Sequence, residues 1–237
     1  MVAKVNAETF IRKLKALRSA EVANSHRHLA SGENDRILGV RMGQVFALAK
    51  EFIEMPLDEI EKLLKSPIHE ARVGAVSIMD YQARSKKTPD VRRKGLFDLY
   101  IRRHDRIDSW DLVDRAAPYV VGSYLFDKPR TVLYKLARSK KMSERRTAIV
   151  STLYFIGKGD VEDAFKIAEL LLEDDHDLIH KAAGWALRFA GDKDRARLEK
   201  FLHQHAETMP RVTLRYAIEK FDKERRIHYL GLKKAKE

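Results

Sequence analysis

The sequence contains no cysteine, which excludes disulfide bonds, iron-sulfur clusters and thiolate zinc sites. Proline and glycine are scarce as well, with 6 and 11 residues in a chain of 237. The apolar residues mostly recur three or four positions apart, which favours helices over strands. Because 44% of the residues are hydrophobic, we expect an all-α protein with a packed core.

Long hydrophobic runs are also missing. The N-terminal stretch MVAKVNAETFIRKLKALRSAE carries charges throughout and predicts an amphipathic helix rather than a signal sequence. No later run approaches the roughly 20 apolar residues that a membrane-spanning helix needs. We therefore expect a protein without membrane contact, located in the cytoplasm and associated with the nucleoid.

Acidic residues are outnumbered. Lysine and arginine total 47 against 35 aspartates and glutamates, so the formal net charge is +12. An excess of this size points first to a polyanionic partner, most often nucleic acid.

A short pattern recurs six times: a basic or polar residue followed by small and aliphatic residues that suit the seam between packed helices. The copies begin at Arg36, Arg72, Ser109, Arg146, Lys181 and Arg215, in steps of 36, 37, 37, 35 and 34 residues. This period suits helix-hairpin repeats of the HEAT type. We predict an α-solenoid, a superhelix of about six HEAT-like repeats with a concave basic groove.

Helix punctuation agrees with this period. Prolines 56, 67, 89 and 129 mark expected helix starts, and the segments 157–160 and 191–194 are expected to end one helix and cap the next. No Ser- or Pro-rich linker divides the chain. We expect one domain over residues 1–237, with residues 223–237 as a candidate basic tail.

The basic residue of the pattern is the basis for a hypothesis about DNA. If the ends of the second helices point into the concave face, the cations that start five of the six copies form a ladder along a phosphate backbone. The alternative is that each cation merely covers neighbouring apolar surface. The ladder comprises Arg36, Arg72, Arg146, Lys181 and Arg215.

The third copy departs from the pattern, because Ser109-Trp110 stands where the others have a cation, among three aspartates. Trp110 and Asp114 are four residues apart and should share a helix face, where a ring beside a carboxylate could hold a cation. We expect Asp108 to cap the helix start and Asp111 to bind a neighbouring backbone group or arginine. Trp185 and Arg188 should likewise share a face.

Four blocks of the sequence carry a resemblance that covers nearly the whole chain: SWDLVD at 109–114, RRTAIV at 145–150, KAAGWALR at 181–188 and RVTLRYAIEKF at 211–221. In this order they resemble the bacterial DNA alkylation repair glycosylases of the AlkD type, which are built from HEAT-like repeats. The resemblance implies excision of positively charged N3- and N7-alkylated purines from double-stranded DNA, without base flipping and with no cofactor or metal.

The resemblance also implies roles for single residues. Asp114 matches the catalytic aspartate, and Trp110 and Trp185 match tryptophans that contact the deoxyribose at the lesion. Arg146 and Arg188 match contacts to the DNA backbone. A monomer that binds DNA containing alkylated bases is the implied assembly.

One departure from the family pattern concerns its first repeat, where relatives place a tyrosine against the lesion. This chain has no tyrosine or tryptophan before Tyr81, and His26 or His28 are the candidates to stand nearby. His176 and His180 could flank a metal, but no third ligand accompanies them. Two alternatives therefore stay open: a non-catalytic relative that binds branched or distorted DNA, and a HEAT-type scaffold for protein partners.

Overall fold

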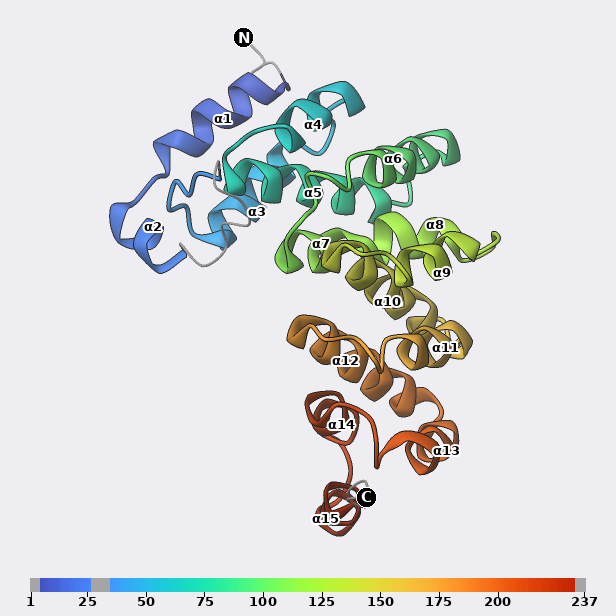
Figure 1. Ribbon diagram of the computed structural model, residues 1–237. Helices are drawn as coiled ribbons and strands as arrows, with labels where there is room; N and C mark the ends of the chain where they lie inside the picture. The colour runs from blue at the N-terminus through green and yellow to red at the C-terminus, as the bar shows by residue number, and fades with distance from the viewer. Residues whose placement is uncertain (1–4, 27–34, 233–237) are drawn as a thin grey trace. The chain divides into compact units, whose positions relative to one another are not determined.

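The computed structural model describes residues 5–26 and 35–232, and these ranges are built from helices (Figure 1). They contain no strand, and an isolated bridge pairs Arg36 with Ile68. The prediction of an all-α protein is therefore confirmed. Among the described residues, each helix is too short or too polar to cross the apolar part of a bilayer.

The chain divides into two compact units, Met1–Tyr124 and Leu125–Glu237, each described by itself below. The helices of the first unit are α1 (Ala7–Ala16), α2 (Ala20–His26), α3 (Met42–Glu51), α4 (Leu57–Leu64), α5 (His69–Arg84), α6 (Asp90–Arg102), α7 (Trp110–Ala116) and the π-helix η2 (Ala117–Gly122). The short α8 (Ser123–Leu125) lies at the boundary. The second unit contains α9 (Thr131–Ala137), α10 (Met142–Gly157), α11 (Glu162–Leu170), α12 (Asp177–Lys193), α13 (Arg195–His205), α14 (Arg211–Ala217) and α15 (Lys223–Gly231).

The first unit is organised around α5, which packs against α3, α4, α6, α7 and η2 and also receives α1. Small residues allow these close approaches: a Cβ added at Gly74 of α5 would lie 2.3 Å from the ring of Phe10 in α1. Nearly every residue of α5 is buried, including charged ones. Because a buried charge is costly unless it is paired, the polar residues of α5 decide which neighbours it binds.

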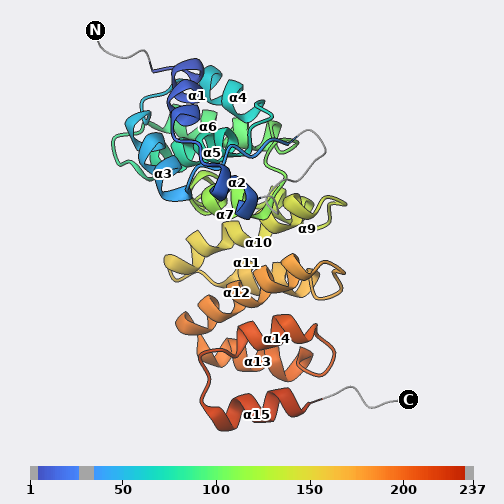
Figure 2. The same ribbon diagram turned by 90° about the vertical axis from the view of Figure 1, so that its left-hand side faces the viewer.

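The second unit shows the repeat most plainly. In Figure 1, α12 and α14 lie in one layer and α11 and α13 lie in the other; Figure 2 views the same helices from the side of α12 and α14. Helix α12 packs between α10 and α14, and also touches α11 and α13. Each helix thus buries its apolar face mainly against the preceding and following pairs, as expected for a helical repeat array.

The recurring sequence pattern lies in α5, at the start of α7, and in α10, α12 and α14, as predicted for five of its six copies. The first copy, residues 36–40, is not helical. Gly39 has a φ of +82°, and the carboxylate of Glu70 accepts the backbone N–H groups of Leu38 (3.0 Å), Gly39 (2.7 Å) and Val40 (3.3 Å). The backbone amides of this segment are therefore satisfied by a buried side chain instead of by a helix.

The predicted helix boundaries are mostly confirmed. Pro56 and Pro89 directly precede α4 and α6, and Asp194 caps α13 by accepting the N–H of Arg197. Gly191 is an exception, because it lies inside α12 rather than in a turn. A Cβ at Gly191 would lie 2.2 Å from Cδ2 and 3.1 Å from Cβ of Leu198, so a larger residue there would push the Leu198 side chain of α13 aside.

The C-terminal segment considered as a basic tail is helical over most of its length. Helix α15 (Lys223–Gly231) begins at Asp222, whose side chain accepts the N–H of Arg225, and Tyr229 is buried against the unit. Residues 233–237 lie outside the described part of the chain.

Candidate functional site

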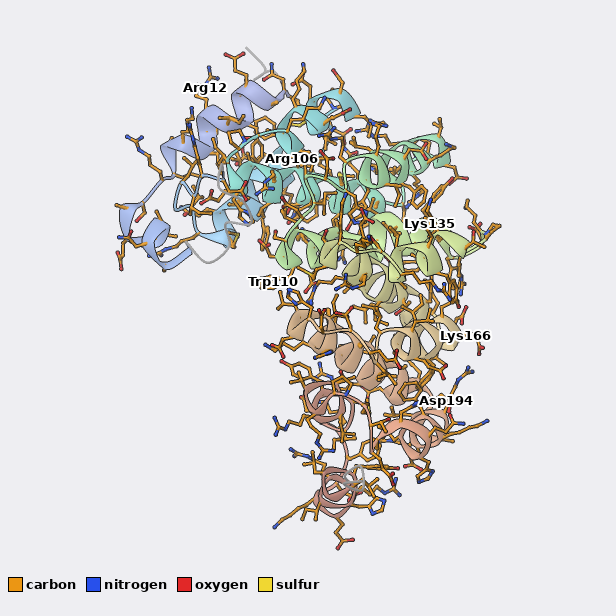
Figure 3. All side chains as sticks on the ribbon, viewed as in Figure 1. Arg12, Arg106, Trp110, Lys135, Lys166 and Asp194 are labelled. Carbon is orange, nitrogen blue, oxygen red and sulfur yellow. The ribbon has the colours of Figure 1, made fainter. Side chains whose placement is uncertain are left out.

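Helix α7 places Trp110 and Asp114 one turn apart, which confirms the predicted spacing on one helix. Trp110 is the first residue of α7 and is 39% exposed, so it does not fill the core. Figure 3 shows it at the surface of its unit. Asp114 is half-buried. An indole ring that is open to a ligand and a carboxylate thus stand together on one short helix.

The chain changes its helical geometry directly after this pair. Pro118 has no N–H to donate to the carbonyl of Asp114, four residues earlier, so the α-helical bonding pattern cannot continue. The backbone widens into the π-helix η2 (Ala117–Gly122) instead. π-Helical turns of this kind occur often at functional sites.

The other two aspartates of the opening motif have structural partners, and they differ from those expected. Asp108 does not cap α7, where Ser109 is the N-cap; its carboxylate lies 2.7 Å from Nη1 of Arg72. Asp111 lies 2.7 Å from Nε2 of His69 and accepts the hydroxyl of Ser109 at 2.6 Å. The expected partner of Asp111 is a neighbouring backbone group or an arginine, and the structure places a histidine from α5 there instead.

The cation ladder is wrong at Arg72. This side chain is fully buried, and its guanidinium binds Asp35 and Asp108 rather than facing solvent. The sequence pattern does not distinguish the two cases, because a cation followed by small residues occurs both at solvent-exposed helix ends and at buried ones. Arg146 is buried too, whereas Arg36 and Arg215 are exposed and Lys181 pairs with Asp177 at 2.6 Å.

The pKa of Asp111 gives a stability prediction. Burial raises this pKa. The hydrogen bond and the charge of His69, together with the Ser109 hydroxyl, lower it by more than burial raises it, so the pKa of Asp111 lies below its usual value. A carboxyl with a lowered pKa stabilises the fold above the pKa of the unfolded chain, about 4. This contribution is lost as the pH falls through the folded-state pKa.

We therefore expect Asp111→Asn to reduce the free energy of unfolding at pH 7 and to have a smaller effect at pH 3. Urea unfolding of both proteins across this pH range measures the difference. A difference of equal size at both pH values would contradict the assignment.

Sequence reasoning missed a cluster around Arg115, the residue after Asp114. Its guanidinium lies 4.8 Å from the ring centres of both Phe46 and Tyr81, and it binds Asp80 at 2.9 Å and Ser77 at 3.0 Å. Burial raises the pKa of Asp80 despite the neighbouring arginines. These partners come from α3 and α5, so no local sequence signal could have revealed them.

In the second unit, Trp185 of α12 is half-buried and meets Phe189 edge-on, with 5.8 Å between ring centres. Phe189 and Tyr216 are 41% and 37% exposed. Gly184 permits this surface, because a Cβ there would lie 2.5 Å from Cβ of Tyr216 and 2.6 Å from the backbone oxygen of Thr213. The aromatic surface on α12 and α14 thus depends on a close helix contact.

The two arginines expected at the DNA backbone already have protein partners. Arg146 is 5% exposed, and its Nη1 donates to the carbonyl of Leu178. Arg188 shares the predicted helix with Trp185 and forms an ion pair with Glu219 of the segment after α14. A phosphate at Arg188 would therefore compete with the carboxylate of Glu219.

This competition predicts that Glu219→Gln binds duplex DNA more tightly than the unchanged chain. A surface ion pair contributes up to roughly 1 kcal/mol, so we expect a gain of about two- to fivefold in affinity. Fluorescence anisotropy with a short labelled duplex at several salt concentrations measures it. Glu224→Gln on α15 is the control, because it also removes one negative charge but at a residue that does not pair with Arg188. An equal gain in affinity in this control would contradict competition at Arg188.

The histidines considered in the sequence are partly accounted for. His176 caps α12 by accepting the N–H of Leu178 at 3.2 Å, and His180 binds the carbonyl of Asp174. His28 and the side chain of His26 lie outside the described residues. Within the described ranges, no group of three or more His, Asp or Glu side chains could hold a metal ion.

The fold defines an all-α protein of the helical repeat class, with an exposed tryptophan and a carboxylate paired on one short helix. A family model described as DNA alkylation repair enzyme matches residues 10–221, and the chain therefore belongs to this family. A solved structure described as a predicted DNA alkylation repair enzyme from Enterococcus faecalis has the same fold. Its TM-score is 0.69 at 17% identity, covering 87% of this chain and 97% of that one. The comparison with curated proteins found no match.

Proposed function

We propose that this protein is a DNA glycosylase that hydrolyses the N-glycosidic bond of positively charged N3- and N7-alkylated purines, such as 3-methyladenine and 7-methylguanine. The observation that carries the proposal is the pair on α7, where the exposed ring of Trp110 lies one turn from the carboxylate of Asp114. Membership of a family of DNA alkylation repair enzymes supports alkylated DNA as the substrate.

The chemistry suits such a pair. Alkylation at N3 or N7 gives the purine a positive charge, so the base can leave with the electron pair of the C1′–N bond and without a general acid. The sugar then carries the positive charge, as in glycoside hydrolysis. In the proposed mechanism, the Asp114 carboxylate stabilises this charge and takes a proton from the water that adds to C1′.

The remaining site residues act on the DNA rather than on the bond. We assign Trp110 and Trp185 to the deoxyribose at the lesion, since an aromatic face attracts a cation. Arg146 and Arg188 are assigned to backbone phosphates. The proposed enzyme acts as a monomer without a cofactor and leaves the base unflipped.

Incubation of the protein with methylated duplex DNA tests the proposal directly. We expect release of 7-methylguanine and 3-methyladenine, detected by chromatography, together with abasic sites in the DNA. Because cationic side chains contact phosphates, binding should weaken steeply with salt. No release at stoichiometric protein would contradict the proposal.

A second function is favoured by one specific observation. The chain has no tyrosine or tryptophan before Tyr81, so the tyrosine that the resemblance implies for the first repeat is missing. A relative that binds branched or distorted DNA without excision would not need it. Tight binding to a branched duplex without base release from methylated DNA would support this alternative.

A further inference from the structure

We propose that His69 and Arg72 of α5 are positioning residues for Trp110 and Asp114, on which they act through the first turn of α7. The proposal rests on the proposed function for its effect on rate. It also stands on contacts within the first unit that involve no DNA.

The two residues contact each other and the chain on both sides of the α7 start. Arg72 donates from Nη1 to Asp108 at 2.7 Å and from Nη2 to Asp35 at 2.5 Å. Its Nη2 also lies 3.5 Å from Nδ1 of His69, whose Nε2 lies 2.7 Å from Asp111. The buried pair on α5 therefore binds Asp108, which precedes the N-cap residue Ser109, and Asp111, which is the second residue of α7.

Burying charged groups in this way costs desolvation free energy that apolar side chains would not. His69 and Arg72 have no exposed side-chain surface, and the carboxylate of Asp35 is only 5% exposed. Replacing a buried ion pair by apolar residues of similar volume is often neutral or stabilising. Apolar packing would not supply directional hydrogen bonds. Such bonds fix the orientation of the first turn of a short helix such as α7.

Helix α7 is attached to α5 at both ends. Asp111 binds His69 near its start, and Arg115 binds Asp80 and Ser77 near its end. Asp114 lies between these two attachments. Because α7 has only 7 residues, a change at either end turns the whole helix and moves Trp110 and Asp114 together.

The connecting segment before α7 is fixed as well. The side chain of Arg106, which Figure 3 labels, donates to the carbonyls of Leu64 (3.3 Å) and Ser66 (3.0 Å), and the Arg106 carbonyl lies 3.5 Å from Arg72. These contacts hold the position of the α7 start, and the contact between His69 and Asp111 holds the rotation of the helix about its axis.

The experiment compares His69→Leu with His69→Gln. Leucine fills the buried space without a donor, whereas the glutamine amide can still donate to Asp111. We expect single-turnover base release at saturating protein to fall roughly 10- to 100-fold in His69→Leu, because small displacements near reacting atoms cost about this much. His69→Gln should recover most of the rate, and the duplex affinity should change little in both.

Two further readouts report on α7 without DNA. In a Trp185→Phe background, Trp110 is the sole tryptophan, so acrylamide quenching of its fluorescence follows the helix start. Amide hydrogen exchange of residues 110–116 follows the helix itself. Both should increase in His69→Leu and in Asp111→Leu, whose side chain cannot accept the His69 hydrogen bond and which serves if His69→Leu does not fold.

Gln82→Leu is the matched control. Gln82 lies on the same helix, and its amide donates to the carbonyls of Ile53 (2.5 Å) and Met55 (2.9 Å), away from α7. It should lower stability without changing Trp110 quenching or exchange in α7. Unchanged quenching and exchange in both His69→Leu and Asp111→Leu, or equal changes in Gln82→Leu, would overturn the proposal. If the unchanged chain releases no base, the glycosylase proposal fails, and these two readouts still decide the positioning role.

Discussion

Asp114→Asn should nearly abolish release of 7-methylguanine and 3-methyladenine while leaving duplex binding intact. The asparagine amide has the same shape but carries no charge, so it can neither stabilise a cationic sugar nor accept a proton from water. Loss of a preorganised electrostatic contact of this kind costs roughly 100- to 1,000-fold in rate. Single-turnover base release, with affinity measured separately by anisotropy, checks both halves of the expectation.

Asp98→Asn on α6 is the matched control, because it removes one carboxylate from the same unit at a surface position paired with Lys94. Its release rate should equal that of the unchanged chain. Undiminished release by Asp114→Asn would remove Asp114 from the mechanism. Loss of binding along with release would instead assign it to the fold.

Arg72→Met should destabilise the protein by about 3 to 5 kcal/mol, which is the usual cost of removing one partner from a buried charge pair. The substitution leaves the carboxylate of Asp35 buried without its guanidinium, and it frees Asp108 at the start of α7. Chemical unfolding followed by circular dichroism measures the change at neutral pH.

The triple variant Asp35→Asn, Arg72→Met, Asp108→Asn separates the cost of an unpaired charge from the worth of the network. It carries no unpaired buried carboxylate, so it should recover most of the lost stability. A loss below about 1 kcal/mol in Arg72→Met would show that water reaches the carboxylates and that the network is not closed.

The sequence predicted those features that depend on neighbours along the chain. A repeat of about 36 residues with few chain breakers sufficed for the all-α fold and for the positions of α5, α7, α10, α12 and α14. The spacing of Trp110 and Asp114 sufficed for a shared helix, since residues four apart lie one turn from each other. Prolines 56 and 89 fixed two helix starts.

Contacts between repeats could not be predicted in this way. The pairing of Arg72 with Asp35 and Asp108 depends on which side of α5 meets which loop, and a cation in the pattern is equally compatible with an open end. The extended backbone of residues 36–40 depends on Glu70, whose buried carboxylate replaces helical hydrogen bonds. The aromatic rings around Arg115 come from α3 and α5 and leave no local trace.

The Arg72 network has a consequence for how this chain can evolve. Its partners lie 37 residues before and 36 residues after it, which is one repeat in each direction. Helical arrays usually gain or lose modules freely, because each module recognises only generic neighbours. Here three successive modules are matched to one another by charge, so a duplication or deletion that separates them leaves a buried ion without its counterpart. Growth or shortening of this protein by whole modules between Asp35 and Asp108 must therefore keep these three charges together.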